Sequence, residues 1–459
     1  MIRSSLTLLS TRIPNARMTA PVAFAGVATD SRQVRPGNLF VALRGERFDA
    51  HDFLPDVMAR GAAAVVAERL PEGLEIPALL VPDTRIALGQ IAAYWRRQFA
   101  IPVIGVTGSN GKTTVKEMIA AILMAEFGPG NFLATEGNLN NDIGVPLTIL
   151  RMDQRHRAAV IELGMNHPGE IAQLAAIAQP SVGLVNNAQR EHQEFMASVE
   201  AVAHENGAVI SALPDDGIAV FPADEPYSAL WRGLAKERGR RKIFSFGLSE
   251  DAKVSCSHQP SDFGSDLTII VGKREISLRL GAAGVHNVRN ALAATACVLA
   301  IGVHRQAIVY GLEHFSPVGG RLQRKHAANG ACVLDDTYNA NPDSVRAAID
   351  VLAQAPAPRI LVLGDMGEVG SQGKAFHEEI GAYARGRGID HLYTLGELAQ
   401  SASTAFGARA RHCRDVDTLN QELEALLAPQ ATVLVKGSRF MKMERVVQRL
   451  TENKTQETH

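Results

Sequence analysis

The most informative segment of the chain reads Gly105-Val106-Thr107-Gly108-Ser109-Asn110-Gly111-Lys112-Thr113-Thr114. It lies between a short apolar, β-branched run, 101–106, and a segment, 113–127, whose apolar residues recur at helical spacing. In such a strand–loop–helix unit, the backbone N–H groups of the loop and the helix dipole favour a bound phosphate. The segment therefore predicts a nucleotide phosphate site made of Thr107, Gly108, Ser109, Asn110, Gly111, Lys112, Thr113 and Thr114.

Two residues of this loop carry the expected chemistry. Lys112 can reach the β- and γ-phosphates of ATP, and the Thr113 hydroxyl can ligate Mg²⁺. The match to the GxxxxGK[ST] pattern is imperfect, because Val106 stands where the first glycine belongs and Gly105 comes one residue early. The alternative is a glycine-rich turn before an ordinary helix, but packing alone gives no reason for the Gly-Lys-Thr-Thr core.

The sequence on both sides of this loop predicts an α/β protein. Apolar strands at 158–163 and 182–186 alternate with helical patterns, which indicates βαβ units and a parallel sheet. The segment 22–88 is typical of a small α/β unit, and a fresh strand–helix alternation after the Pro/Gly-rich stretch 316–320 predicts a second doubly wound sheet. We expect three domains: a small N-terminal α/β domain (1–90), a central P-loop-type parallel-sheet ATPase domain (91–316) and a C-terminal Rossmann-like α/β domain (317–459).

Composition limits the partners and the compartment. The chain has 459 residues, enough for several cores, and its 47 Lys and Arg against 48 Asp and Glu leave no basic field for nucleic acid. Its four cysteines are scattered without CxxC spacing, which fits a reducing cytoplasm. The N-terminal apolar stretch is broken at 10–12, and the longest apolar region, 291–303, is too short to span a bilayer. We therefore expect a cytoplasmic protein with no membrane anchor and no nucleic-acid partner.

Two polar residues follow predicted strands and would face a Mg²⁺ at the phosphate loop if both strands neighbour that loop. Glu162 follows the run 158–161, and His192 follows 182–187. Since ligands gather at the carboxyl ends of parallel strands, both are candidate catalytic and Mg²⁺-facing residues together with Thr113. Taken singly, Glu162 fits a solvated or capping residue better, and His192 fits a hydrogen-bonded structural residue better. Imidazole is also an unusual Mg²⁺ partner, because this ion prefers oxygen.

An ordered series of further motifs resembles one family, the Mur ligases, over nearly the whole chain. The phosphate loop has this family's own shifted spacing, which accounts for Val106. The other matches are Asp30-Ser31-Arg32 with Pro36-Gly37 and Leu39-Phe40, Asn138-Leu139-Asn140-Asn141 running into Gly144-Val145-Pro146-Leu147-Thr148, Glu162-Leu163-Gly164-Met165, His286-Asn287-Val288-Arg289-Asn290-Ala291, Gly320-Arg321, Asp335-Asp336-Thr337-Tyr338-Asn339-Ala340-Asn341-Pro342, Leu363-Gly364-Asp365-Met366-Gly367-Glu368 and Lys436-Gly437-Ser438.

The resemblance implies an ATP-dependent, ADP-forming amide ligase of peptidoglycan biosynthesis. The text from Asp336 to Pro342 looks like the dipeptide-adding type, and an Asp-Asn-Pro-Arg motif of the diaminopimelate-adding type is missing from the sequence. The implied substrates are UDP-N-acetylmuramoyl-tripeptide and D-alanyl-D-alanine, joined through an acyl phosphate made with ATP and Mg²⁺. We expect a monomer, and the sequence leaves open whether the third peptide residue is lysine or diaminopimelate.

The resemblance also implies roles for individual residues. By it, Lys112, Glu162 and His192 are catalytic, and the N-terminal domain binds the uridine nucleotide. The implied substrate contacts are Ser31, Arg32, Asn138, Asn140 and Asn141. The implied nucleotide contacts beyond the phosphate loop are Asn287 and Asn290 near the adenine and Arg321 and Asp336 from the C-terminal domain. Without the family, Ser31 and Arg32 fit a surface turn, and the three asparagines at 138, 140 and 141 fit an Asn-rich turn. Asn287 fits a helix N-cap, and Arg321 fits a surface ion pair.

One departure from the family pattern concerns a metal ligand. Many relatives have Lys-Gly-Glu, with a carbamylated lysine that helps to hold a Mg²⁺, where this chain has Asn206-Gly207-Ala208. Either another acid, such as Glu205 or Glu191, replaces the lysine, or the second metal is held differently.

Two other functions compete with this interpretation. One is another amide ligase, of a different Mur type or of the folylpolyglutamate type. The other is a nucleotide-dependent switch ATPase, which would need the phosphate loop but not Arg321, Asp336, Ser31 or Arg32.

Overall fold

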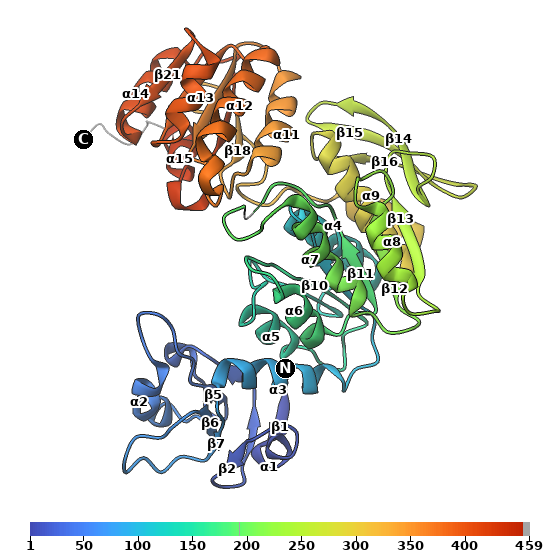
Figure 1. The fold of residues 1–459 in the computed structure, drawn as a ribbon, viewed down its shortest axis with the longest axis vertical. Coiled ribbons are helices and arrows are strands. Elements are labelled where there is room, and N and C mark those ends of the chain that lie inside the picture. Colours follow the sequence, from blue (N-terminus) through green and yellow to red (C-terminus); the bar gives the residue numbers. More distant parts are fainter. Residues whose placement is uncertain (192, 453–459) are drawn as a thin grey trace.

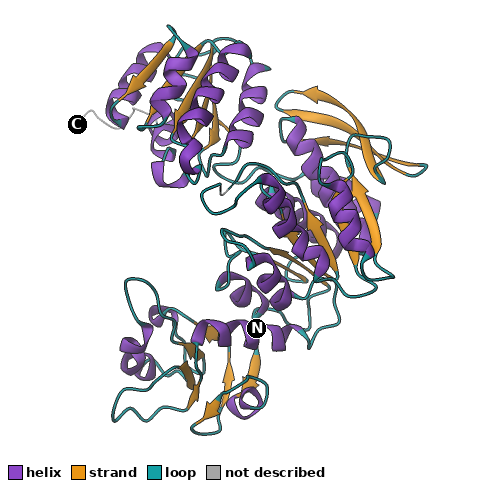
Figure 2. Cartoon of the chain, viewed as in Figure 1, coloured by secondary structure: helices purple, strands orange, loops and turns teal. Residues whose placement is uncertain are grey.

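Short buried strands build three separate main sheets, which follow one another along the chain (Figure 1). The computed structural model describes residues 1–191 and 193–452, so His192 lies outside the described residues. Helices pack against each sheet, and the central unit lies between the other two (Figure 2). The expected architecture of three α/β units is confirmed.

The N-terminal unit has a five-stranded sheet in the order β2-β7-β6-β5-β4, parallel except for β2. A separate antiparallel pair joins β1 to β3. The strands are β1 (Arg3–Ser5), β2 (Arg17–Met18), β3 (Ala23–Ala25), β4 (Val27–Ala28), β5 (Leu39–Val41), β6 (Ala64–Ala67) and β7 (Ala78–Leu80). The helices are α1 (Leu6–Ser10), α2 (Leu54–Ala59) and α3 (Thr84–Arg96), with 3-10 turns at Ser31–Gln33 and Ala50–Phe53.

The central unit has a nine-stranded sheet in the order β16-β15-β14-β13-β12-β11-β8-β10-β9. From β9 to β14 in this order, neighbouring strands pair in parallel. The pairs β14–β15 and β15–β16 are antiparallel and extend the sheet. The strands are β8 (Val103–Thr107), β9 (Phe132–Ala134), β10 (Ala158–Glu162), β11 (Val182–Val185), β12 (Ile218–Pro222), β13 (Lys242–Phe246), β14 (Val254–Ser261), β15 (Gly264–Val271) and β16 (Arg274–Leu280). The helices are α4 (Lys112–Phe127), α5 (Gly144–Ile149), α6 (Glu170–Ala178), α7 (Val199–Ser211), α8 (Ser228–Lys236), α9 (Val285–Ala300) and α10 (Arg305–Glu313).

The position of β8 in this sheet decides where ligands meet. All five of its residues are buried, and it pairs with β10 on one side and β11 on the other. The loops that follow these three parallel strands therefore emerge at one edge of the sheet. The condition set for Glu162, that its strand neighbours the strand before the phosphate loop, is met.

The C-terminal unit has a six-stranded sheet in the order β17-β18-β22-β19-β20-β21, parallel except for β17. The strands are β17 (Gln323–His326), β18 (Cys332–Asp336), β19 (Arg359–Gly364), β20 (His391–Leu395), β21 (Ala410–Cys413) and β22 (Thr432–Lys436). The helices are α11 (Pro342–Ala353), α12 (Gly373–Gly386), α13 (Ala399–Phe406), α14 (Val416–Leu426) and α15 (Glu444–Thr451), with 3-10 turns at Gly370–Gln372 and Arg439–Met441. Two apolar clusters lie on this sheet, as expected for a doubly wound unit.

Helix α3 joins the first two units. Its buried residues Leu88 and Ile91 belong to the same apolar cluster as Ile171 and Leu174 of α6. The indole Nε1 of Trp95 donates to the carbonyl of Met152 at 3.0 Å. Among residues 1–191 and 193–452, the helices are too short or too polar to cross a membrane.

Candidate active site

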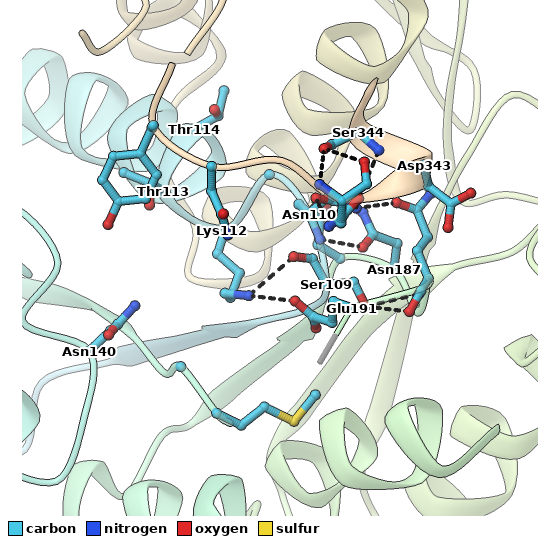
Figure 3. A pocket seen from close by; sticks show the side chains of 18 of the residues that line it. Ser109, Asn110, Lys112, Thr113, Thr114, Asn140, Asn187, Glu191, Asp343 and Ser344 are labelled. Carbon is cyan, nitrogen blue, oxygen red and sulfur yellow. Dashed lines mark hydrogen bonds and ion pairs between the residues drawn. The ribbon is translucent and has the colours of Figure 1, made fainter. Parts of the chain in front are cut away.

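A cavity of about 760 Å³ lies where loops from all three units converge. Most of the residues singled out from the sequence line it. These are Ser109, Asn110, Gly111, Lys112, Thr113, Thr114, Asn140, Asn141, Glu162, Asn287, Asn290, Arg321 and Asp336. Figure 3 labels Ser109, Asn110, Lys112, Thr113, Thr114 and Asn140 among them. The cavity thus brings together candidates that are more than two hundred positions apart in the sequence.

The phosphate loop connects β8 to the N-terminus of α4. Gly111 is the N-cap of α4 with φ +81°, and it offers no side chain to the first N–H groups of the helix. A Cβ at this position would lie 2.5 Å from Oδ1 of Asn290 and 2.8 Å from Nδ2 of Asn186. Glycine is therefore required by both space and backbone conformation, and the helix N-terminus is left available for an anion.

The Lys112 side chain folds back over this loop. Its Nζ donates to the carbonyls of Gly108, at 2.5 Å, and Ser109, at 3.2 Å. It also lies 3.5 Å from Oε2 of Glu191 (Figure 3). Only 16% of the Lys112 side chain is exposed. The ammonium group is thus held at the mouth of the loop, where the expected β- and γ-phosphates of ATP would lie.

Glu162 is a buried carboxylate at the end of β10. Its Oε1 accepts hydrogen bonds from Thr113 Oγ1 at 3.2 Å and from Asn140 Nδ2 at 2.8 Å. Its Oε2 is buried and has no hydrogen-bond partner among the described residues. A buried carboxylate oxygen without a hydrogen-bond partner costs folding free energy unless a cation binds it. Glu162 and Thr113 together therefore fit the oxygen ligands that Mg²⁺ prefers.

The C-terminal unit reaches into the phosphate loop through Arg321. Its Nη2 donates to Thr113 Oγ1 at 2.8 Å, and its guanidinium carbon lies 4.2 Å from the centroid of the Tyr338 ring. This arginine contacts a hydroxyl and a ring, so the alternative of a surface ion pair is wrong. Asp336, from the end of β18, is paired with Lys436 at 2.6 Å.

Asn287 and Asn290 belong to a chain of buried amides beside the loop. Asn287 Nδ2 donates to the carbonyl of Ala283 at 2.8 Å, and Asn290 Nδ2 donates to Asn287 Oδ1 at 3.1 Å. Asn186 Nδ2 in turn donates to Asn290 Oδ1 at 3.0 Å. The N-cap of α9 is Gly284, so Asn287 is not the N-cap of this helix.

Some candidates lie away from the cavity. Ser31, Arg32 and Asn138 are absent from its lining, as are Thr107 and Gly108 at the base of the phosphate loop. The side chain of Arg32 is 84% exposed and pairs with Asp30, which lowers the pKa of that carboxyl to about 2. Ser31 and Arg32 of the N-terminal unit are therefore not brought into the cavity with the phosphate loop.

In the segment 205–208, where this chain departs from the family pattern, Glu205 has a structural role. Glu205 accepts from the N–H groups of Gly169 and Ile171, both at 2.8 Å, at the start of α6. Asn206 is fully buried, and its Oδ1 accepts from Thr107 Oγ1 at 2.6 Å. Of the two acids considered from the sequence, Glu191 faces the phosphate loop and Glu205 does not.

Sequence reasoning missed several residues that line the cavity. Among them are Asn186 and Asn187, which bind the backbone of Asn110, and Glu225, which follows β12. Burial raises the pKa of Glu225 to about 7, against the opposing effect of Arg289. The strand-end rule that identified Glu162 could also have found Asn186 and Glu225, because both follow parallel strands.

Comparison with known proteins assigns each unit to one family. The model of the Mur ligase family catalytic domain matches residues 23–96, the Mur ligase middle domain 106–298, and the Mur ligase glutamate ligase domain 320–439. The chain belongs to the Mur ligase family. The expectation of a Mur-type ligase is confirmed.

Individual Mur ligases resemble the chain over its full length. It is 42% identical to the UDP-N-acetylmuramoyl-tripeptide--D-alanyl-D-alanine ligase of Escherichia coli (strain K12), over 99% of this chain and 100% of that protein. A crystal structure of MurF from Acinetobacter baumannii is 36% identical, has a TM-score of 0.89 and is covered to 97% in both chains. The MurF ligase from Thermotoga maritima in complex with ADP is 27% identical with a TM-score of 0.83, over 93% of this chain and 97% of that one.

Proposed function

We propose that this Mur ligase joins D-alanyl-D-alanine to UDP-N-acetylmuramoyl-tripeptide with consumption of ATP, and so makes the UDP-muramoyl-pentapeptide precursor of peptidoglycan. The observation that carries the proposal is the bond from Arg321 of the C-terminal unit to Thr113 of the phosphate loop, at 2.8 Å. A phosphate loop alone would serve any ATPase. A second unit that delivers a cation to the loop inside a shared cavity fits transfer of the phosphoryl group to a bound substrate.

The proposed reaction has two steps. An oxygen of the terminal carboxylate of the tripeptide attacks the γ-phosphorus of ATP, and the bond to the β-phosphate oxygen breaks to release ADP. The free amine of D-alanyl-D-alanine then attacks the acyl carbon, loses a proton and expels inorganic phosphate. Carboxylate is a poor acyl donor, and phosphorylation makes it a good one.

The residues of the loop act mainly through charge and position. Lys112 and Arg321 place positive charge beside the transferring phosphoryl group, where preorganised electrostatics contribute most of the rate. Asn140 lies next to the Glu162 carboxylate, and we assign Asn140 and Asn141 to the acceptor end of the substrate. Ser31 and Arg32 lie outside this cavity. They remain candidate contacts of the uridine nucleotide, which is the end of the substrate distant from the reacting carboxylate.

Mg²⁺ fits the proposed site. Thr113 and Glu162 would hold the ion, and a bound Mg²⁺ supplies charge neutralisation on the phosphate oxygens. Clusters of three or more His, Cys, Asp or Glu side chains suited to a metal are absent from the described residues. This agrees with an ion that takes most of its ligands from phosphates and water.

The test is product formation by the purified protein. ATP and Mg²⁺ are supplied with both substrates or with either alone, and phosphate release and product mass are measured. We expect release that needs both substrates, a pentapeptide product, and loss of both in Lys112→Ala. Lys374→Ala, an exposed lysine on α12, is the matched control and should behave as wild type.

The competing functions predict different results. Phosphate release that ignores both substrates would contradict the ligase and favour the switch ATPase. Release that needs a folate and glutamate instead would favour the folylpolyglutamate type. Parallel assays with lysine- and diaminopimelate-containing tripeptides identify the third residue of the accepted peptide.

A further inference from the structure

Arg190 forms a clamp on the C-terminal unit that the proposed chemistry does not use. It lies in the loop between β11 and α7 of the central unit. Its Nη2 donates to Asp343 Oδ1 at 2.6 Å, its Nη1 donates to Glu379 Oε2 at 2.7 Å, and its backbone N–H donates to Asp343 Oδ2 at 2.9 Å. Its guanidinium carbon also lies 5.3 Å from the centroid of the Phe376 ring. The planar guanidinium thus binds two helices, α11 and α12, in a geometry that lysine cannot reproduce.

The same loop binds the phosphate loop on its other side. Asn110 donates from its backbone N–H to Asn187 Oδ1 at 2.8 Å and from Nδ2 to Gln189 Oε1 at 2.6 Å. The backbone N–H of Gln189 donates to Ser109 Oγ at 2.9 Å. The segment 187–190 therefore links the phosphate loop directly to the C-terminal unit.

Asp343 lies at the point where the C-terminal unit touches the phosphate loop. It is in the first turn of α11, whose N-cap is Asn341. Asn341 Nδ2 donates to Asn110 Oδ1 at 2.9 Å across the same boundary. A shift of Asp343 would move this contact and, within the same unit, the Arg321 that reaches Thr113.

The acids of the clamp do not need Arg190 for the folding of their own unit. Glu379 also accepts from Arg346 of α11 at 3.0 Å, and Asp343 lies in the first turn of a helix, where the dipole favours a negative charge. The side chains of Arg190 and Asp343 are each 24% exposed, and that of Glu379 is 32% exposed. The free energy of the clamp therefore acts on the docking of the two units more than on the stability of either one.

We infer that Arg190 is a positioning residue, which holds the C-terminal unit over the phosphate loop while the phosphoryl group is transferred. The inference rests on the proposed ligase function. Arg190 lines the cavity, and in this role its side chain binds Asp343 and Glu379. It acts through Asp343 and Glu379, and so sets the fraction of molecules in which Arg321 reaches the loop.

The test compares three variants of the full-length protein. Arg190→Ala should lower kcat for pentapeptide formation by roughly tenfold to a hundredfold, because small displacements of positioning groups have effects of this size. Arg190→Lys should recover part of the loss. Arg346→Ala is the matched control, because it removes a bond to the same Glu379 without crossing the boundary between the units, and should stay near wild type. The affinity for a non-hydrolysable ATP analogue should change less than kcat in all three.

A structural measurement separates positioning from folding. Small-angle X-ray scattering with the ATP analogue and the tripeptide substrate should give a larger radius of gyration for Arg190→Ala than for wild type and Arg346→Ala, at an unchanged unfolding midpoint. If Arg190→Ala does not fold, Asp343→Asn and Glu379→Gln together remove the clamp from the other side and should give the same results.

Three results would decide against the inference. Wild-type kcat in the clamp variants would overturn it, as would equal effects of Arg190→Ala and Arg346→Ala, or a radius of gyration unchanged from wild type. If wild type itself makes no pentapeptide, the proposed function fails, and scattering then decides the role of Arg190 alone.

Discussion

At the scale of single residues, burial and a bond to a cation shift the pKa values of two acids in opposite directions. Burial raises the pKa of Glu225 from 4.5 to about 7, whereas the bond to Arg32 lowers the pKa of Asp30 from 3.8 to about 2. The two acids therefore titrate on opposite sides of their ordinary range. Their contributions to stability have opposite dependence on pH.

The first prediction concerns Glu225. In the unfolded chain this acid loses its proton near 4.5, but in the folded protein it keeps the proton until about 7, so stability falls as pH rises between these values. Glu225→Gln removes this loss. The variant should therefore gain in melting temperature relative to wild type between about pH 5 and about pH 8, as followed by calorimetry.

Asp30→Asn is the control for this measurement. Its folded pKa is lowered, so its stabilising contribution is lost only as pH falls toward about 2. The difference between Asp30→Asn and wild type should be flat in the same range of pH. A Glu225→Gln curve parallel to wild type would show that the carboxyl is charged in the folded protein.

At the scale of elements, the phosphate loop depends on the close approach of three separate segments. Gly111 at the start of α4 meets Asn186 after β11 and Asn290 in α9. The buried amide chain through these residues leaves space only for a hydrogen atom at Gly111. The element is therefore intolerant of a side chain at its first position.

The second prediction follows from this contact. Gly111→Ala should weaken binding of the ATP analogue by more than about tenfold, because the added Cβ displaces the amides and the loop with them. Titration calorimetry measures the affinity. Gly128→Ala is the matched control: its φ is +79°, but the nearest atom to an added Cβ is at 3.8 Å.

Gly128→Ala should cost stability, about 1–3 kcal/mol, because its backbone combines φ +79° with ψ 172°, which is accessible almost only to glycine, and should leave the nucleotide affinity unchanged. Equal losses of affinity in the two variants would mean that backbone strain, and not the contact with Asn290 and Asn186, disturbs the site.

At the scale of the whole molecule, the C-terminal unit contacts the central unit beyond the bonds of Arg321 and Asn341 to the phosphate loop. The clamp of Arg190 is one such contact. The turn between β14 and β15 is another: Phe263 packs against the apolar cluster of the C-terminal unit, and its ring centroid lies 4.1 Å from the guanidinium carbon of Arg324 in β17. The hairpin thus provides a second support at a distance from the phosphate loop in the sequence and in the sheet.

The third prediction tests this second support. Phe263→Ala removes a partly buried ring and should destabilise the docked C-terminal unit by about 1–3 kcal/mol. Limited proteolysis and hydrogen exchange over 321–326 report the docking. Lys273→Ala, in the exposed turn between β15 and β16, is the control and should leave both unchanged. Equal protection of 321–326 in Phe263→Ala and wild type would show that the hairpin contributes nothing to docking.

Local sequence by itself determined the strand–loop–helix unit of 103–127, the α/β class and the candidate metal pair Thr113 and Glu162. These follow from patterns that operate within a few residues: glycines where the backbone must turn, a lysine at a helix start, and a carboxylate at a strand end. The strand order that brings β10 and β11 beside β8 then makes the candidates neighbours.

Only the tertiary structure decided which distant residues meet. The pairing of Arg190 with Asp343 and Glu379, and the contact of Arg321 with Thr113, join positions far apart in the sequence, and no local period or spacing marks them. The same holds for Ser31 and Arg32, whose place outside the cavity depends on how α3 packs the N-terminal unit against α6. The physical reason is that packing between units is set by surfaces assembled from many segments, whereas a phosphate loop is built almost entirely from its own backbone.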